Sequence, residues 1–133
     1  MLKTYQGSCH CGAIRYEADI DLDEGTGRCN CSVCRKRRFW GTTVPPEQFR
    51  LLAGEEALGD YQFATLSVHH RFCRTCGTPA FGHGFIAEAG GAFYSVSLAT
   101  LDDAAADLAA APVQYMDGAG NNWWNPPAET RHL

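Results

Sequence analysis

The sequence lacks any long apolar run. No stretch in its 133 residues approaches the roughly 20 consecutive apolar residues that a membrane-spanning helix needs. The first residues, Met1–Gln6, also lack the apolar core of a secretory signal peptide. We therefore expect no membrane segment and a cytoplasmic location.

A surplus of positive charge is also absent. Eleven basic and fifteen acidic residues give a net charge of −4, so no global field attracts a polyanion, and we expect no nucleic-acid partner. The hydrophobic fraction of 45% and the charged fraction of 20% are those of an ordinary globular chain. At this length we expect a single domain over residues 1–133.

Helical signals are scarce, whereas short β-like segments bounded by glycine, proline or acidic residues are frequent. We expect strands over Ala13–Ala18, Arg38–Val44, Tyr61–Leu66, His69–Cys73 and Ala92–Leu98. Two short helices are expected over Ser32–Arg37 and Asp102–Ala111, the second with Asp102 as its N-cap and ended by Pro112. The sequence therefore predicts a mainly β fold of short strands with little helix.

No cysteine is isolated in the sequence. The seven cysteines form close-set groups at positions 9 and 11, then 29, 31 and 34, then 73 and 76. An odd number leaves one thiol over from any complete disulfide framework. In a reducing compartment, clustered thiols of this kind indicate metal binding.

Two of the groups resemble each other. The motifs CHCG at Cys9 and CRTCG at Cys73 both place a glycine, Gly12 or Gly77, directly after the second thiol. A zinc knuckle needs a backbone conformation that glycine permits. Four sulfur ligands from Cys9, Cys11, Cys73 and Cys76 predict a closed tetrahedral zinc site that stabilises the fold, the alternative being a free or oxidised set of thiols.

The remaining group, CNCSVC, supplies only Cys29, Cys31 and Cys34. Three protein ligands leave one coordination position of zinc open, as in catalytic sites. Because three thiolates already make the centre anionic, we expect it to bind a substrate thiol rather than to activate water. Such a thiolate is a nucleophile suited to addition to an aldehyde.

A basic run follows this group directly. Arg35, Lys36 and Arg37 are continued by Arg38, and Arg28 precedes the first thiol. One interpretation is a solvated basic turn. The other is a binding site for the carboxylates of a thiol such as glutathione, and the sequence leaves both open.

Other side chains are weaker candidates. His10, His69, His70 and His83 offer a fourth ligand or a general base, but histidines near strand ends are more often structural. The His10 ring should point away, since its neighbours on both sides are ligands. The tryptophans Trp40, Trp123 and Trp124 are candidates for a pocket wall or for core packing, and Asp102 and Asp103 are better interpreted as a helix start than as catalytic carboxylates.

The motifs GSCHCGAIRYE, CNCSVCRK, RFCRTCGTPAF and SLATLDD together resemble those of the glutathione-dependent formaldehyde-activating enzymes, also called the centromere protein V family. This resemblance covers most of the chain. It implies a zinc-stapled fold of the Mss4-like or β-tent kind with short antiparallel strands. It also implies one structural and one catalytic zinc ion, and carbon–sulfur lyase activity on S-hydroxymethyl-glutathione, the adduct of glutathione and formaldehyde.

Matched motif by motif, Cys9, Cys11, Cys73 and Cys76 correspond to the structural zinc site of that family. Cys29, Cys31 and Cys34 correspond to its catalytic site. The sequence departs from the family's namesake at the C-terminal residues Trp123–Pro127, which leaves room for a pocket of different shape. The alternative function is a non-catalytic, zinc-stapled binding module in which the three-cysteine site is vestigial.

Overall fold

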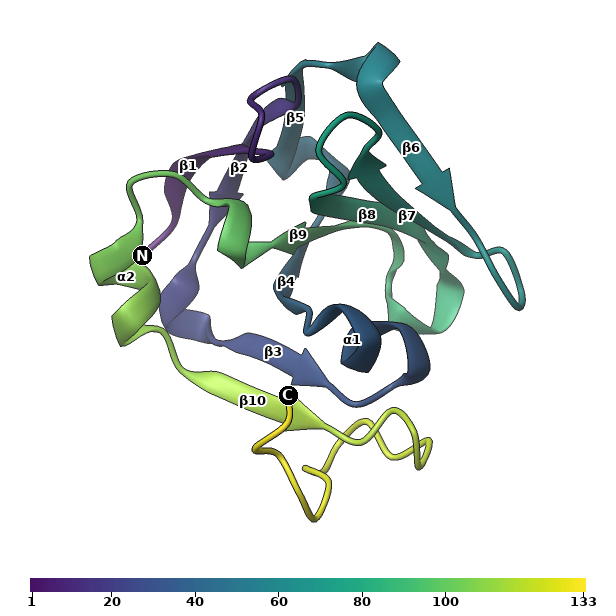
Figure 1. Cartoon of the computed structure of the whole chain (residues 1–133). Helices are drawn as coiled ribbons and strands as arrows, with labels where there is room; N and C mark the ends of the chain where they lie inside the picture. The colour runs from purple at the N-terminus through teal and green to yellow at the C-terminus, as the bar shows by residue number, and fades with distance from the viewer.

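The computed structural model describes residues 1–133, and its strands form two β-sheets (Figure 1). The smaller sheet has the strand order β1-β2-β5 and is antiparallel throughout. Its strands are β1 (Lys3–Ser8), β2 (Arg15–Ile20) and β5 (Phe49–Ala53). The chain is therefore mainly β, as the sequence predicts.

The larger sheet has seven strands in the order β10-β3-β4-β9-β8-β7-β6. Its strands are β3 (Thr26–Cys29), β4 (Trp40–Val44), β6 (Leu58–Tyr61), β7 (Val68–Cys73), β8 (Pro79–Ile86), β9 (Gly91–Ser97) and β10 (Val113–Met116). All neighbouring strands are antiparallel except β10 and β3, which run parallel. The expectation of antiparallel strands therefore holds for every pair but this one.

Helix is limited to two α-helices of six residues each, α1 (Ser32–Arg37) and α2 (Ala105–Ala110). Short 3-10 turns cover residues 22–24, 46–48, 55–57, 87–89 and 98–100. None of these helices has the length and hydrophobicity that crossing a bilayer requires.

The core lies between the two sheets and follows from the alternation of side chains along the strands. In β2 every second residue, Tyr16, Ala18 and Ile20, is buried. These side chains belong to one hydrophobic cluster with Phe81 of β8 and Val96 of β9 in the larger sheet. Burial of each large apolar side chain contributes about 1.5–3 kcal/mol, so this cluster fixes the relative position of the two sheets.

Four of the five predicted strands match observed strands, but the strand predicted over Tyr61–Leu66 is wrong, since it shares only Tyr61 with an observed strand. The actual strand β6 ends at Tyr61, and the following residues form a turn in which Ala64 and Leu66 have φ angles of 53° and 59°. The side-chain amide of Gln62 donates to the Leu66 carbonyl at 2.9 Å. This bond closes the turn, so the apolar residues there do not extend a strand.

The predicted helix over Ser32–Arg37 is confirmed, but the predicted start of the second helix is wrong. Its N-cap is Ala104, not Asp102, and no side chain caps it. The Asp102 carboxylate instead accepts hydrogen bonds from the Ser8 hydroxyl at 2.8 and 3.1 Å. Asp102 thus joins the region before α2 to the end of β1.

Candidate metal centres

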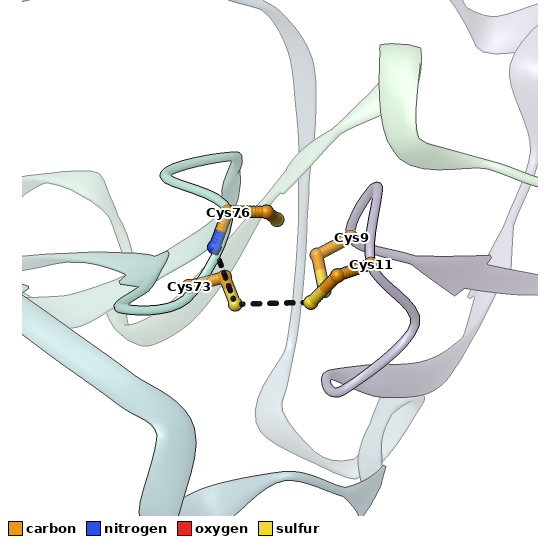
Figure 2. Close-up of side chains that lie close together, drawn as sticks. All are labelled: Cys9, Cys11, Cys73 and Cys76. Carbon is orange, nitrogen blue, oxygen red and sulfur yellow. Dashed lines mark hydrogen bonds between the residues drawn. The ribbon is translucent and has the colours of Figure 1, made fainter.

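Four cysteines from distant parts of the chain converge in one group. Cys9 and Cys11 lie in the turn between β1 and β2, and Cys73 and Cys76 lie at the turn between β7 and β8. Figure 2 shows the four side chains pointing toward one another, and all four sulfur atoms lie within 4.8 Å of each other.

The spacing of these sulfur atoms fits a tetrahedral zinc ion. The Cys9–Cys11 and Cys11–Cys73 sulfur distances are both 3.7 Å. Zinc–sulfur bonds of about 2.3 Å in a tetrahedron place the sulfurs about 3.8 Å apart. The four thiols present are therefore matched to zinc in both chemistry and geometry.

The backbone around these thiols takes the form that the CHCG and CRTCG motifs predict. Gly12 and Gly77 have φ angles of 81° and 80°, a conformation that residues with a Cβ rarely adopt. The turns bring the amide of Ile14 to 3.3 Å from the Cys9 sulfur and the amide of Cys76 to 3.5 Å from the Cys73 sulfur. Hydrogen bonds of this kind stabilise thiolates, the form that binds metal.

The other three cysteines form a second group at the junction of β3 and α1. Cys29 ends β3, Cys31 is the N-cap of α1, and Cys34 lies one turn later. Their sulfur atoms lie within 4.8 Å of one another. The amide of Cys31 donates to the Cys29 sulfur at 3.3 Å, so the loop itself orients the first ligand.

The thiols of this group differ in acidity. A hydrogen bond from Cys34 lowers the pKa of Cys31 to about 5, and the same bond raises the pKa of Cys34. Burial raises the pKa of Cys29. One thiolate therefore forms readily at neutral pH, which favours capture of a soft divalent cation such as zinc.

Access distinguishes the two groups. A cavity of about 560 Å³ is lined by Cys29, Cys31 and Cys34, and by none of the other cysteines. In the four-cysteine group, Cys9 and Cys73 are 3% and 0% exposed and Cys11 is exposed at the surface, but none of the four borders a cavity of this kind. A ligand can therefore approach the three thiols through the cavity, whereas the four thiols complete a coordination sphere by themselves.

Comparison with known proteins gives the family. The sequence model of one protein family, the glutathione-dependent formaldehyde-activating enzymes, matches residues 4–117 of this chain, a range that includes all seven cysteines. The chain belongs to this family. A crystal structure of a Rhodobacter sphaeroides protein is also similar, with a TM-score of 0.70 and 33% sequence identity over 82% of this chain and 99% of that chain. The predicted Mss4-like β fold is confirmed by this match.

Among the basic residues that flank the three-cysteine group, Arg37 alone lines the cavity. It is half-buried, and burial lowers its pKa. Lys36 is exposed and lines, with Arg37, a second hollow of about 570 Å³, while Arg35 is exposed and lines neither. The basic run is thus divided by α1 between solvent and cavity.

The two flanking arginines have other partners. The guanidinium of Arg28 lies over the ring of Trp40, 5.0 Å from its centroid, which is a cation–π contact. The Trp40 indole donates to the Thr26 hydroxyl at 2.7 Å, so Trp40 packs at β3 and does not line the cavity. Arg38 donates to the Leu133 carbonyl at 3.4 Å.

Of the candidate histidines, only His70 lines the cavity. Its ring stacks on Phe63 with centroids 5.5 Å apart, and burial together with the charge of Arg37 lowers its pKa. His69 and His83 are paired across β7 and β8 and lie on the opposite face of the sheet from His70. Their rings stack with centroids 4.7 Å apart. His10 is exposed and belongs to neither cysteine group.

Motif reasoning did not identify the apolar walls of the cavity. They come from Val33 and Phe39 near α1, Phe63 in the turn after β6, Phe93 in β9, Met116 in β10, and Trp123. Of the three tryptophans, Trp123 alone lines the cavity. Phe93 and Ser95 both line the cavity and are two residues apart in β9, which is a signal that strand alternation could have provided.

Proposed function

We propose that the protein is a zinc-dependent carbon–sulfur lyase that forms and cleaves the adduct between a glutathione-like thiol and an aldehyde, as in S-hydroxymethyl-glutathione. The observation that carries this proposal is the contrast between the two cysteine groups. Four thiols form a complete ligand set, whereas three thiols open into a cavity large enough for a substrate. Membership of the family supports the same chemistry.

Each cysteine group is proposed to hold one zinc ion. Cys9, Cys11, Cys73 and Cys76 join the turns of the two sheets and have a structural role. Cys29, Cys31 and Cys34 hold the catalytic ion, which when bound would supply a coordination position that keeps a substrate thiol in the thiolate form.

The reaction joins the thiol sulfur to the carbonyl carbon, while the thiol loses its proton and the carbonyl oxygen gains one. His70 lies on the cavity wall, and burial lowers its pKa, which favours the neutral imidazole that can accept a proton. In this proposal it accepts the thiol proton and returns it to the oxygen. The reverse sequence cleaves the carbon–sulfur bond.

The basic run is proposed to bind the carboxylates of the thiol. Arg37 is placed for this role because its half-buried guanidinium lines both the cavity and the adjoining hollow. Lys36 lines the hollow beside it, and Arg35 adds positive charge from the exposed face of α1. A guanidinium favours carboxylates through two parallel hydrogen bonds.

We also propose that residues 1–133 form one domain, because a single hydrophobic cluster joins both sheets. A cytoplasmic setting is proposed because thiols remain available as metal ligands in a reducing compartment, and all seven cysteines here are free of disulfides.

The proposal is tested with the zinc-loaded protein, glutathione and ¹³C-formaldehyde. Exchange NMR measures how fast the labelled carbon moves between formaldehyde hydrate and the thiol adduct. We expect the wild type to accelerate this exchange and Cys31→Ser to abolish the acceleration.

The control is Cys31→Ser with the four-cysteine site still loaded, which measures any effect of the folded protein alone. If the wild type gives no faster exchange than this variant with formaldehyde or with larger aldehydes, the lyase proposal is wrong. A non-catalytic zinc-stapled binding module would then be the better account.

A further inference from the structure

The cavity beside Cys29, Cys31 and Cys34 has one wall formed by residues that follow the range matched to the family. The family match ends at residue 117, and the residues that follow, 118–133, are here called the C-terminal segment. In Figure 1 this segment continues from β10, close to β3 and α1. Two hydrogen bonds of 2.9 Å attach this part of the chain to the three-cysteine loop. The Asn30 side-chain amide donates to Asp117, the residue before the segment, and the Ala119 backbone amide donates to the Asn30 side-chain oxygen.

Trp123 reaches the cavity through a close approach of this segment to the thiols. At Gly118, an added Cβ would lie 2.7 Å from both the Cys29 sulfur and the Trp123 ring. Only a glycine therefore allows the backbone to pass between the sulfur and the ring. Trp123 lines the cavity, whereas its neighbour Trp124 is 85% exposed and does not.

The other walls of the cavity are also largely apolar, although the group that formaldehyde adds to a thiol is small and polar. The cavity volume of about 560 Å³ lies in the range of pockets that enclose drug-sized ligands. A glutathione adduct belongs to that size class whichever aldehyde it carries, so the character of the walls distinguishes the aldehydes. Aromatic walls are provided by Phe39, Phe63, Phe93 and Trp123, and charged groups on the wall are few. Walls of this character stabilise an apolar ring on the aldehyde carbon and contribute little to binding of the hydroxymethyl group of a formaldehyde adduct.

We infer that the substrate is the adduct of a thiol with an aldehyde that carries a bulky apolar substituent, and that Trp123 of the C-terminal segment is a wall that selects this substituent. The inference rests on the proposed lyase function and names its substrate class. For benzaldehyde, the thiol sulfur bonds to the aldehyde carbon, the thiol loses one proton, and the former carbonyl oxygen gains one. No oxidant or reductant takes part.

Binding to the zinc-loaded protein tests the cavity separately from turnover. The probes are S-benzylglutathione and S-methylglutathione, which share the peptide and differ only in the apolar group. We expect calorimetry to give about tenfold or more tighter binding of the benzyl compound, from burial of its ring. Equal affinities in the wild type would overturn the inference.

Variants locate the selecting wall. Trp123→Ala should reduce the benzyl preference to about threefold or less, Trp123→Phe should restore most of it, and the matched control Trp124→Ala should leave it unchanged. Ser95→Leu fills the cavity from β9 and should abolish benzyl binding while leaving methyl binding intact. An unchanged preference in both Trp123→Ala and Ser95→Leu would show that the ring binds elsewhere and would overturn the inference.

Turnover then separates this inference from the function on which it rests. Exchange of glutathione with benzaldehyde and with formaldehyde is measured by NMR in the same samples, and we expect a higher kcat/KM for benzaldehyde. Formaldehyde exchange without a benzyl preference would contradict the substrate class and leave the lyase function standing. A benzyl preference without exchange of any aldehyde would contradict the lyase function and leave only an apolar binding cavity.

Discussion

The side-chain amide of Asn30 donates a hydrogen bond of 2.9 Å to the carboxylate of Asp117. Asn30 lies between the thiols Cys29 and Cys31, and Asp117 directly follows β10. The Asp117 carboxylate also accepts from the Gly120 amide at 3.1 Å. This pair therefore connects the loop that carries the open thiol group to the chain segment that carries Trp123.

Replacing Asn30 with alanine should detach this segment from the thiol loop. Two hydrogen bonds are lost, and each contributes about 0.5–1.5 kcal/mol or more where the acceptor is charged. We expect a decrease of about 1–3 kcal/mol in the free energy of unfolding, together with a red shift of tryptophan fluorescence as Trp123 becomes more exposed. Urea denaturation measures the free energy of unfolding, and the emission spectrum of the folded protein without urea measures the red shift.

The matched control is Gln6→Ala, which removes an exposed amide-to-carboxylate bond of 3.1 Å between β1 and β2. It should change the stability by less than about 0.5 kcal/mol. If Asn30→Ala is as mild as this control and the fluorescence is unchanged, the C-terminal segment is held by other contacts.

The two cysteine groups should differ in their importance for folding. Cys73→Ser removes a buried ligand from the site that joins the β1–β2 turn to the β7–β8 turn. Structural zinc contributes about 10–16 kcal/mol in small zinc domains, which is comparable to or larger than the typical net stability of about 5–15 kcal/mol. We expect this variant to be unfolded or insoluble at 25 °C.

Cys31→Ser, in contrast, should leave a folded protein with a lower thermal midpoint, because Cys29, Cys31 and Cys34 come from one short segment. Far-ultraviolet circular dichroism during heating compares the two variants. Equal loss of structure in both would contradict the division into a structural and a catalytic site.

Sequence reasoning was most successful where function depends on local chain geometry. The turns at Gly12 and Gly77 and the helix Ser32–Arg37 could all be predicted, because glycine position and cysteine spacing constrain only a few consecutive residues. The division of the seven thiols into four and three also agrees with the two groups that the fold brings together.

What could not be predicted depends on contacts between distant segments. The parallel pairing of β10 with β3 brings Met116 next to Cys29 in register, and no local pattern encodes such pairing. The turn after β6 contains apolar residues typical of a strand, yet Phe63 stacks on His70 and forms part of the cavity. The walls of the cavity are therefore a property of the tertiary fold.

The pKa of His70 should depend on Arg37 more than on the other cations of α1. Burial lowers this pKa most, followed by the charges of Arg37 and His69, while Asp60 opposes them. We expect Arg37→Gln to raise the pKa of His70 toward its ordinary value of about 6.5, measured by NMR titration of the imidazole. Lys36→Gln removes the same charge from the exposed side of α1 and should leave it unchanged.

The lowered pKa of His70 also sets the direction of a stability change. Between the ordinary value and the lower folded value, the unfolded chain binds more protons than the folded one, so the free energy of unfolding falls as the pH falls through this window. Arg37→Gln should reduce the difference between the pKa values of His70 in the folded and unfolded chains. It should therefore weaken the pH dependence of the free energy of unfolding. A His70 pKa that responds equally to both substitutions would show that the buried arginine has no special effect.

Cobalt substitution tests most directly the central claim, that the three-cysteine group is an open metal site that binds a substrate thiol. Metal analysis should first give two ions per chain, one for each cysteine group, and Cys31→Ser should retain one. Titration with glutathione should then change the visible absorption of cobalt in the wild type without metal release, and should leave the spectrum of Cys31→Ser unchanged. If both cysteine groups bind cobalt and neither glutathione nor any other small thiol alters the spectrum, the account of a thiol-binding catalytic site is contradicted.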